Sequence, residues 1–485
     1  MLKISKISVL VIFLISFHFS YAQDSIVFTK EGHIEKNEIF NLIYIPIEIP
    51  KGINSISVQQ IYNEGEGANK NVLNMGIYDP RGYEVGNPKG FRGWSGGAKT
   101  SFFVTNMDAS TGYIAGPIYS GVWQVLIYPS DISDAGIDWR LEIKATKGKE
   151  TNLFKVNPAN NAINEIPGWY HGDLHMHTLH SDGKRTTQEL VEEAHARKLD
   201  FIISTEHNTN SANLAWGKYD SKDLLILNGE EVTSTEFGHW NAIGLKHDTY
   251  IDWRYPPQEL WINQMVDQVH QDDGLAIINH PFFDKQLINT FKYDFRLFDG
   301  VEVWNGNWNI LNNLAVAWWN DQLIAGHKLI AIGASDTHIS EGSRSNLGTP
   351  QTVVYAQSLS ATDLLKGMKQ GSVYIRANDS IEISFEVYAG DEKAMLGDTL
   401  RIGSDENSYD VHLQVKICKD QKLIIYSNLG IFKETILSSD DEDLAFEINN
   451  TEIKFLRVEV RTEEDAMLAL TNPIFISYQN KPSGN

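Results

Sequence analysis

The sequence predicts a multidomain protein in which a distorted (β/α)7-type barrel is flanked by N-terminal and C-terminal all-β, sandwich-like domains. Three observations lead to this fold class. Short apolar strands alternate with helical segments between residues 168 and 377, a pattern typical of strands buried on both faces of a parallel sheet. On either side of this region, apolar and polar residues alternate with the period of two that indicates β-strands. The length of 485 residues suits two or three domains of roughly 150 residues each.

The first 22 residues have the pattern of a secretory signal peptide. Lys3 and Lys6 give a positive start, residues 7–19 are mostly apolar, and a small-x-small pattern ends at Ala22. We therefore expect cleavage near Ala22 and export to the periplasm or the extracellular space. No later stretch contains the roughly 18 apolar residues that a membrane span needs, so we expect no membrane span. Cys418 is the only cysteine, which excludes an intrachain disulfide.

Residues 23–150 are predicted to form the N-terminal sandwich-like domain, and residues 151–167, rich in Asn and Pro, a linker. Strands are expected at residues 43–49, 56–62, 72–78, 102–105, 122–128 and 139–143. Short strands at this spacing, separated by Gly and Pro turns, are typical of two packed sheets. Trp94 and Trp123 could line a ligand groove, but the interpretation that we favour is that they belong to the core.

Residues 168–377 are predicted to form the barrel. The expected strands are 200–204, 224–227, 240–245, 275–279, 300–303, 329–333 and 352–355, and further helices are expected near 257–271, 309–326 and 360–370. Thr186 and Glu189 have the spacing of a capping box that opens a helix ending near Lys198. Seven or so strand–helix repeats favour a closed or distorted barrel. Residues 378–485 return to the β pattern and are expected to form the C-terminal domain, with strands at 381–387, 411–417, 422–427, 455–461 and 473–478.

Charge and histidine content restrict the function. The formal net charge is −22, which argues against a nucleic-acid partner because such a surface must neutralise phosphates. An anionic substrate would therefore need a local positive site, which bound metal ions would supply. Twelve of the fifteen histidines lie between His171 and His338, inside the predicted barrel.

The stretch from Gly172 to Gly183 contains the first candidate metal ligands. His175 and His177 are two residues apart, so in an extended strand both imidazoles lie on the same face. Asp182 follows in the turn after the strand. Neutral imidazole and carboxylate together suit borderline divalent metals, although an isolated pair of this kind could equally form local hydrogen bonds in an ordinary strand.

Further candidates lie at the ends of the other predicted strands. The whole set comprises His175, His177, Asp182, Glu206, His207, Glu231, His239, His280, Asp336 and His338. Strand ends of a parallel barrel meet at one rim. One such side chain would be an ordinary hydrogen-bonded surface residue, but burying so many together without cations would be costly. The pattern therefore predicts two or three divalent ions.

At these residues the sequence resembles the PHP (polymerase and histidinol phosphatase) metallohydrolases, over roughly residues 168–375. The motifs that carry the resemblance are His175-Met-His177 with Asp182, His207 followed by Glu231, His280, and Asp336-Thr-His338. It is most similar to the exported branch that includes the CehA/McbA-type hydrolases. The segments that match this branch are 172–178, 205–208 and 238–244, together with the flanking segments 78–82, 93–97 and 470–473.

The resemblance implies two or three Zn, Mn or Fe ions. The implied ligands are His175, His177, Asp182, His207, Glu231, His239, His280, Asp336 and His338. Related subfamilies place the histidine equivalent to His239 slightly differently. Glu206 stands where many relatives have Asp, and we expect it to orient His207 or a water. We expect catalysis to involve Asp336, His338, Glu206 and Arg344.

The leading functional hypothesis is hydrolysis of a small-molecule phosphoester by a metal-bridging hydroxide. Lys184, Arg185, Arg344 and Lys285 could hold phosphate oxygens, or be solvated surface charges. The second hypothesis is carbamate or ester hydrolysis at the same centre, with aromatic side chains packing a neutral substrate (Trp216, Trp240, Trp253, Trp304 and Trp308). The third is a non-catalytic surface protein, which would bind carbohydrate through its β domains.

Overall fold

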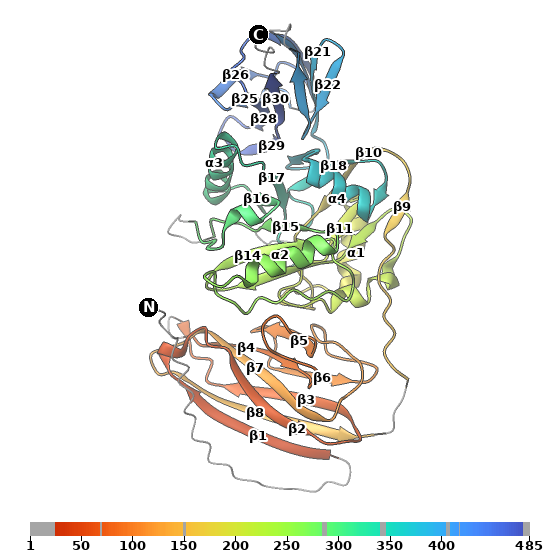
Figure 1. Ribbon diagram of the computed structural model, residues 1–485, viewed down its shortest axis with the longest axis vertical. Helices are drawn as coiled ribbons and strands as arrows, with labels where there is room; N and C mark the ends of the chain where they lie inside the picture. Colours follow the sequence, from red (N-terminus) through yellow and green to blue (C-terminus); the bar gives the residue numbers. More distant parts are fainter. Residues whose placement is uncertain are drawn as a thin grey trace, which may run out of the picture.

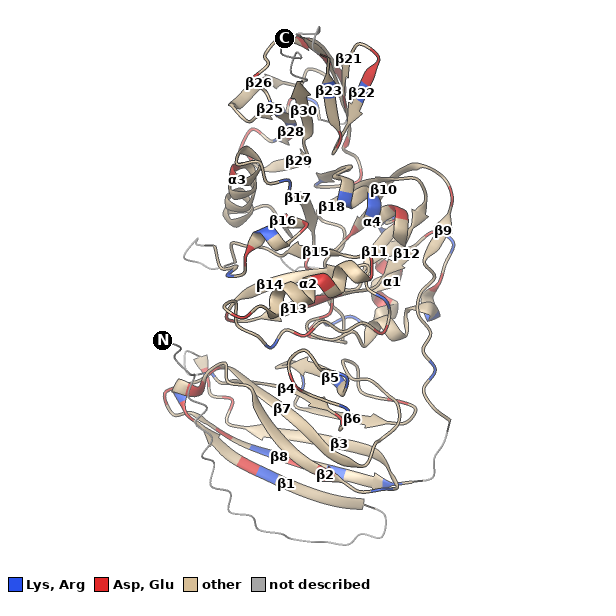
Figure 2. Cartoon of the chain, in the orientation of Figure 1, with Lys and Arg blue, Asp and Glu red and all other residues tan. Residues whose placement is uncertain are grey.

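The chain forms three β-rich parts stacked along the long axis of the molecule, in the order of the sequence (Figure 1). This computed structural model describes residues 25–67, 70–148, 152–283, 289–339, 346–403, 408–416 and 418–478. The predicted signal peptide, Lys285 and Arg344 lie outside these residues. Acidic and basic residues are dispersed over all three parts (Figure 2).

The N-terminal part consists of two four-stranded antiparallel sheets, with strand orders β1-β8-β3-β6 and β2-β7-β4-β5. The strands are β1 (Ser25–Ile34), β2 (Ile43–Ile49), β3 (Ile53–Tyr62), β4 (Val72–Tyr78), β5 (Phe91–Gly96), β6 (Ser101–Thr105), β7 (Gly121–Asp131) and β8 (Ile137–Lys147). Apolar residues from both sheets share one core. Trp94 and Trp123 are buried, in agreement with the core interpretation. The sequence patterns missed β1, which has few buried side chains, and β5, which contains two glycines and a buried arginine.

An extended segment runs along the side of the molecule from the N-terminal to the central part (Figure 1). The backbone N–H of Phe154 donates to the carbonyl of Asn106, and that of Asn157 donates to the carbonyl of Leu214. The expected linker is therefore attached to both parts along its described length. Its end forms β9 (Ala162–Asn164), which pairs with β19 (Leu359–Ser360).

The central part has two groups of paired strands. Their bounds are β10 (Gly168–Asp173), β11 (Phe201–Ile203), β12 (Leu225–Leu227), β13 (Gly229–Ser234), β14 (Gly238–Ile243), β15 (Leu275–Ile278), β16 (Gly300–Asn305), β17 (Ile330–Ala334), β18 (Gln351–Ala356) and β20 (Val373–Arg376). One group has the order β12-β11-β10-β18-β20 and the other β13-β14-β15-β16-β17. The prediction of an all-parallel sheet was wrong, because β14 and β18 run antiparallel to their neighbours.

Isolated backbone bridges join the two groups at one end. Met176, just past β10, forms a parallel bridge with Thr337, just past β17, and His207, past β11, forms another with Glu231 in β13. Together with the regular pairs, these bridges complete a circuit of β10, β11, β13, β14, β15, β16 and β17. Within this circuit β14 alone runs in the opposite direction, so its first residues lie at the end where the other strands finish.

Helices connect the central strands. The described α-helices are α1 (Thr187–Ala196), α2 (Trp261–Gln271), α3 (Ile310–Ile324) and α4 (Ala361–Gln370), and 3-10 turns occur at η1 (Lys36–Glu38), η3 (Ala212–Leu214), η4 (Trp216–Tyr219) and η5 (Phe295–Leu297). The capping box predicted at Thr186 and Glu189 is present at the start of α1. No helix in the described ranges has both the length and the apolar character that crossing a membrane requires.

The C-terminal part shares a sheet with the central part across the predicted boundary between residues 377 and 378. Its strands are β21 (Glu382–Ala389), β22 (Glu392–Met395), β23 (Thr399–Ile402), β24 (Tyr409–Lys416), β25 (Lys422–Ser427), β26 (Gly430–Ile436), β27 (Asp441–Ile448), β28 (Phe455–Arg461), β29 (Met467–Thr471) and β30 (Ile474–Tyr478). Strand β20 pairs with β29, so an 11-stranded sheet runs through both parts. A second sheet, β22-β21-β24-β27, packs on its C-terminal portion.

Buried polar side chains fasten the three parts to one another. Arg254 of the central part forms a two-point ion pair with Asp252 and donates to the carbonyl oxygen of Tyr83 at 2.6 Å. Its guanidinium lies 4.4 Å from the ring centre of Tyr78. At the other junction, Asn472 makes hydrogen bonds of 2.8 Å to both the N–H and the carbonyl of Ala331. One apolar cluster also extends through all three parts.

Candidate metal centre

The end of the central part where the two strand groups are bridged gathers all nine residues that the sequence singled out as metal ligands. His175 and His177 follow β10, His207 follows β11, and His280 follows β15. Glu231 and His239 lie in the hairpin of β13 and β14, while Asp336 and His338 follow β17. His239 lies at the beginning of β14 and not at its end. It still reaches this rim because β14 runs antiparallel to its neighbours.

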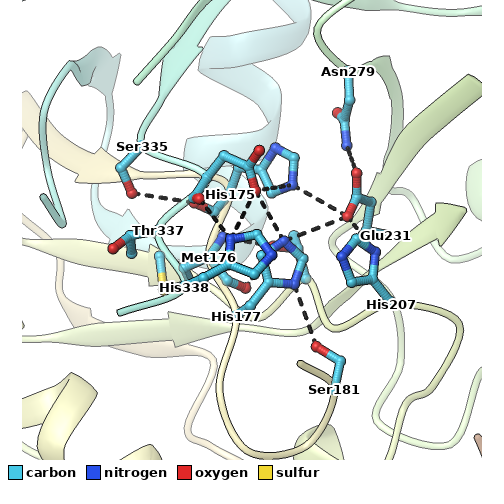
Figure 3. A network of polar contacts seen from close by, with 12 residues as sticks. His175, Met176, His177, Ser181, His207, Glu231, Asn279, Ser335, Thr337 and His338 are labelled. Atoms are coloured by element: carbon cyan, nitrogen blue, oxygen red, sulfur yellow. Dashed lines mark hydrogen bonds and ion pairs between the residues drawn. The ribbon is translucent and has the colours of Figure 1, made fainter. Parts of the chain in front are cut away.

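These side chains form four overlapping groups, in each of which the potential ligand atoms lie within 4.8 Å of one another. The groups are His177/Asp182/His207/His338, His175/His280/Asp336, His175/His177/Glu231 and Glu231/His239/His280. Figure 3 shows the side chains of His175, His177, His207 and His338 converging with Glu231 on one small region. We call the first group the outer position, since Asp182 and His338 are its most exposed members, and the other three the inner groups.

Two carboxylates connect the inner groups. Glu231 Oε2 lies 3.4 Å from the Nε2 atoms of both His175 and His177, and Glu231 Oε1 lies 3.2 Å from His239 Nδ1. Asp336 Oδ1 lies 3.3 Å from His175 Nε2 and 3.1 Å from His177 Nε2. Each carboxylate is thus placed to be shared between ligand groups.

The outer position is built around Asp182. Its Oδ1 lies 3.3 Å from His338 Nε2 and 3.5 Å from His207 Nε2. The Asp182 side chain is 44% exposed, whereas those of His175, His177 and Glu231 are 0% exposed. The cluster therefore has a buried floor and an open side.

The pKa values of the cluster are shifted because buried imidazoles and carboxylates lie close together. Burial alone would lower the pKa of His207, but the charges of Glu231 and Asp182 outweigh it and raise the pKa to about 9. Burial and the neighbouring His338 and His207 lower the pKa of His177 to about 3. Burial would raise the pKa of Glu231, yet the surrounding histidines hold it well below its ordinary value. The carboxylates are consequently ionised at neutral pH, as ligands must be.

Three buried polar atoms of the cluster show that the residues fit metal ions. His175 Nε2, Glu231 Oε2 and Asp182 Oδ1 are shielded from solvent and make no hydrogen bond of acceptable geometry among the described residues, although each lies close to other ligand-type atoms. Leaving such atoms unpartnered is costly. Because all three are ligand-type atoms directed into the groups described above, divalent cations are the partners that would satisfy them.

No protein-family model and no curated protein matches the sequence. The chain is similar to the crystal structure of a two-domain protein from Bacteroides vulgatus ATCC 8482 that contains a predicted PHP-like metal-dependent phosphoesterase. The two are 18% identical, the match covers 67% of this chain and 100% of the other, and the TM-score is 0.37. A TM-score this low does not establish a shared fold.

The backbone is strained where it presents several of these side chains. Asp336 has a φ of 51° and His280 a φ of 23°, and Asn208, directly after His207, has a φ of 54°. Residues other than glycine rarely adopt positive φ, and such strain is concentrated at functional sites. The surrounding hydrogen bonds that hold these conformations include Asp336 N–H to the carbonyl of His175 and Asn208 N–H to the carbonyl of Glu231.

Sequence reasoning missed three buried residues that hold the ligands in place. Glu302 Oε1 lies 3.1 Å from His175 Nδ1, and its Oε2 accepts from the backbone N–H of His280. Asn279 donates to Glu231 Oε1 at 2.9 Å (Figure 3). Asp173 accepts from the backbone N–H groups of His175 and Ser335, which ties the ends of β10 and β17 together. A charged residue inside the apolar strand 300–303 was a signal that could have identified Glu302.

The side chain of Glu206, expected to orient His207 or a water, makes its hydrogen bonds to another segment. Both of its carboxylate oxygens face the segment after His177, where they accept hydrogen bonds from Thr178 and from Ser181 Oγ at 2.6 Å. Burial raises the pKa of Glu206. Its contacts are those of a residue that shapes the loop carrying Asp182.

The structure also changes the expectation for the basic residues. Arg185 is buried, pairs with Glu193 and donates to Thr337 Oγ1 at 2.8 Å, so it is a structural residue and not a free phosphate ligand. Lys184 is exposed. Arg344 and Lys285 lie outside the described residues, and their role stays a prediction.

The aromatic residues expected around a neutral substrate are mostly core. Trp216, Trp240, Trp253 and Trp304 are at most 4% exposed. A cavity of about 560 Å³ instead borders His239 and His280, and its apolar wall is formed by Phe283 and Phe291. Phe283 is 65% exposed, and its ring centre lies 5.2 Å from that of His280.

Proposed function

We propose that the chain is a metal-dependent hydrolase of the PHP type, and that its first substrate class is small-molecule phosphoesters. The observation that carries the proposal is the presence of four overlapping groups of ligand-type side chains, in which buried atoms of His175, Glu231 and Asp182 make no hydrogen bond of acceptable geometry. The seven-stranded circuit around these groups supports the distorted (β/α)7-type barrel that the proposal includes.

The nine clustered residues would hold two or three divalent ions, with Zn, Mn or Fe favoured by the mixture of imidazole and carboxylate ligands. Such ions would supply Lewis-acid chemistry, polarising the bond to be hydrolysed and activating water near neutral pH. Glu231 and Asp336 would be shared between positions, because each lies within reach of several imidazoles.

The surrounding side chains prepare the site for this chemistry. Glu302 accepts from His175 Nδ1 and so orients the Nε2 atom toward the cluster, an arrangement that also raises the basicity of the imidazole. Asp336 and His338, which we expect to act in catalysis, have side chains that are 17% and 33% exposed. They therefore lie between the buried floor and the open side, where a substrate would enter.

A second candidate, carbamate or ester hydrolysis, is favoured by the cavity beside His239 and His280. Its described lining includes two phenylalanines and a single cation, Lys292. A neutral carbonyl substrate needs no additional cationic clamp, since it develops only one negative charge during attack. The same centre would serve both reactions.

The decisive experiment assays metal-loaded protein against phosphomonoesters, phosphodiesters and aryl carbamates, with His175→Ala and Asp336→Ala as inactive controls. We expect phosphoester turnover that chelation abolishes and that either substitution lowers to less than a tenth, equivalent to about 1.4 kcal/mol of barrier. Turnover of carbamates alone would establish the second candidate. Turnover of neither, with carbohydrate binding retained, would favour the non-catalytic alternative.

Export is part of the proposal. Residues 1–22 have the sequence of a signal peptide and lie outside the described residues. Mass spectrometry of the protein recovered from its native compartment is expected to show a chain beginning just after Ala22. A chain retaining the first 22 residues would contradict cleavage.

A further inference from the structure

A lysine of the N-terminal sandwich reaches into the loop that carries Asp182. Lys99 lies in the turn between β5 and β6, and its Nζ donates to the carbonyl oxygens of Leu179 at 2.8 Å and Ser181 at 3.2 Å. The side chain is partly buried, and burial lowers its pKa, while the charges of Glu206 and Asp182 oppose that decrease. The sandwich thus contributes a cation to the loop that carries Asp182, one of the residues of the outer position.

Gly112, from the same sandwich, makes a second contact with this region. Its carbonyl accepts from Thr209 Oγ1 at 3.0 Å, and its N–H faces His180 Nδ1 at 3.5 Å. Gly112 has a φ of +91°, and a Cβ at this position would lie 2.6 Å from the carbonyl oxygen of His180. Only glycine permits so close an approach. The sandwich therefore touches both the segment before Asp182 and the segment after His207.

The loop is held from its other side by Glu206. That carboxylate accepts from Thr178 and Ser181, while Lys99 binds the carbonyls of Leu179 and Ser181. The segment preceding Asp182 is consequently fixed between an anion of the central part and a cation of the N-terminal part. Without the lysine, two carbonyls of this segment would lose their donor.

We propose that Lys99 is a positioning residue for Asp182, so that the N-terminal sandwich controls metal occupancy of the outer position. The inference rests on the proposed function, because it concerns one of the metal positions. The physical reason is that Asp182 lies on a loop and is 44% exposed, whereas the ligands of the inner groups lie in or directly after strands. The loop that carries Asp182 therefore depends on a contact between the two parts.

The test is metal content and metal affinity of Lys99→Met, with Lys99→Arg as the conservative variant. After dialysis against metal-free buffer, Lys99→Met is expected to retain the inner metals and to lose about one equivalent. In titrations with Mn²⁺ or Zn²⁺, its weakest site is expected to bind about 10- to 100-fold less tightly, the usual effect of removing a residue that supports a ligand. Lys99→Arg should restore most of the lost equivalent. Lys51→Met, an exposed lysine in the turn between β2 and β3, should bind like the wild type.

Full metal content and unchanged affinity in Lys99→Met would overturn the inference and leave the proposed function intact. Loss of all metals together with a lower melting temperature of the metal-free form would also overturn it, because that result indicates general unfolding. A wild-type protein that binds no metal would overturn both proposals. If Lys99→Met does not fold, Thr209→Val decides in its place: this change removes the hydrogen bond to Gly112, and the same selective loss is expected.

Discussion

Glu231 Oε2 and His207 Nδ1 lie 2.7 Å apart, and the same two residues form a parallel backbone bridge. The opposite ring nitrogen of His207 faces Asp182. One imidazole therefore spans from the carboxylate shared by the inner groups to the outer position. A shift of β13 relative to β11 would disturb both regions together.

Glu231 and Asp182 should differ in how many metal ions their replacement removes. Glu231→Gln is expected to lose two equivalents, since Glu231 belongs to two of the ligand groups, and Asp182→Asn only one. Elemental analysis of protein purified without chelator measures both. Asp267→Asn, on the exposed face of α2, is the control. Equal losses in the two variants would contradict the shared role of Glu231.

Glu302→Gln should weaken metal binding although Glu302 is not a proposed ligand. The change removes the charge that faces His175 Nδ1 and one acceptor of the buried network. We expect metal affinity to fall by about 10- to 100-fold, measured by competition with a chelating dye. Glu259→Gln, at an exposed position, should have no effect. Unchanged affinity in Glu302→Gln would mean that other contacts orient His175.

The stability of the metal-free protein should fall between about pH 6.5 and pH 9. The pKa of His207 is raised from 6.5 to about 9 in the folded state, so its protonation stabilises the fold fully below pH 6.5 and is lost as the pH rises through 9. The lowered pKa of His177 has its effect below pH 6.5 and does not oppose this trend.

Urea unfolding at several pH values, with chelator and with bound metal, tests this prediction. Metal ions replace the proton on each ligand, so the metal-loaded protein should show a smaller decrease over the same interval. A metal-free protein whose stability is constant or rises from pH 6.5 to pH 9 would show that the carboxylates do not hold a proton on His207.

Arg185→Met should reduce stability without changing substrate preference. The guanidinium is buried and bonds to Glu193 and Thr337, and loss of a charged hydrogen bond costs about 1.5–3 kcal/mol. The unfolding free energy should fall by this amount. The ratio of kcat/KM for phosphoesters to that for carbamates should stay the same, whereas a selective loss for phosphoesters would reinstate Arg185 as a phosphate ligand.

Asn472→Ala should destabilise the junction between the central and C-terminal parts. The side chain satisfies both the N–H and the carbonyl of buried Ala331, and each buried group left unpartnered costs about 1–3 kcal/mol. We expect a loss of at least about 2 kcal/mol in urea unfolding. The exposed Asn450→Ala should change stability by less than about 0.5 kcal/mol. Similar values for the two variants would contradict the bridging role.

The helices and the ligand cluster could be predicted from the sequence because their signals lie within a few neighbouring residues. The capping box at Thr186 and the paired spacings of His175/His177 and Asp336/His338 need only neighbouring residues to be recognised. Strand direction has no such signal. An apolar run has the same periodicity in either direction, so the antiparallel course of β14 and β18 could not be predicted, nor could the pairing of β20 with β29.

The residues around the ligands were harder to predict because their partners are distant in sequence. The residue type of Glu206 or Arg185 does not reveal whether its side chain contacts a substrate or another part of the protein. Only the folded arrangement shows that Glu206 binds the loop at Thr178 and that Arg185 pairs with Glu193. Lys99 is separated from Leu179 by 80 positions, and its sequence surroundings are those of an ordinary β-turn lysine.

The sheet that continues from β20 into β29 limits how the C-terminal part can move relative to the candidate metal centre. Rotating the C-terminal part away from the central part would require breaking the ladder between these strands and the bonds of Asn472. These contacts oppose a hinge at this junction. Under the proposed function, substrate would therefore enter and leave without a hinge motion at this junction.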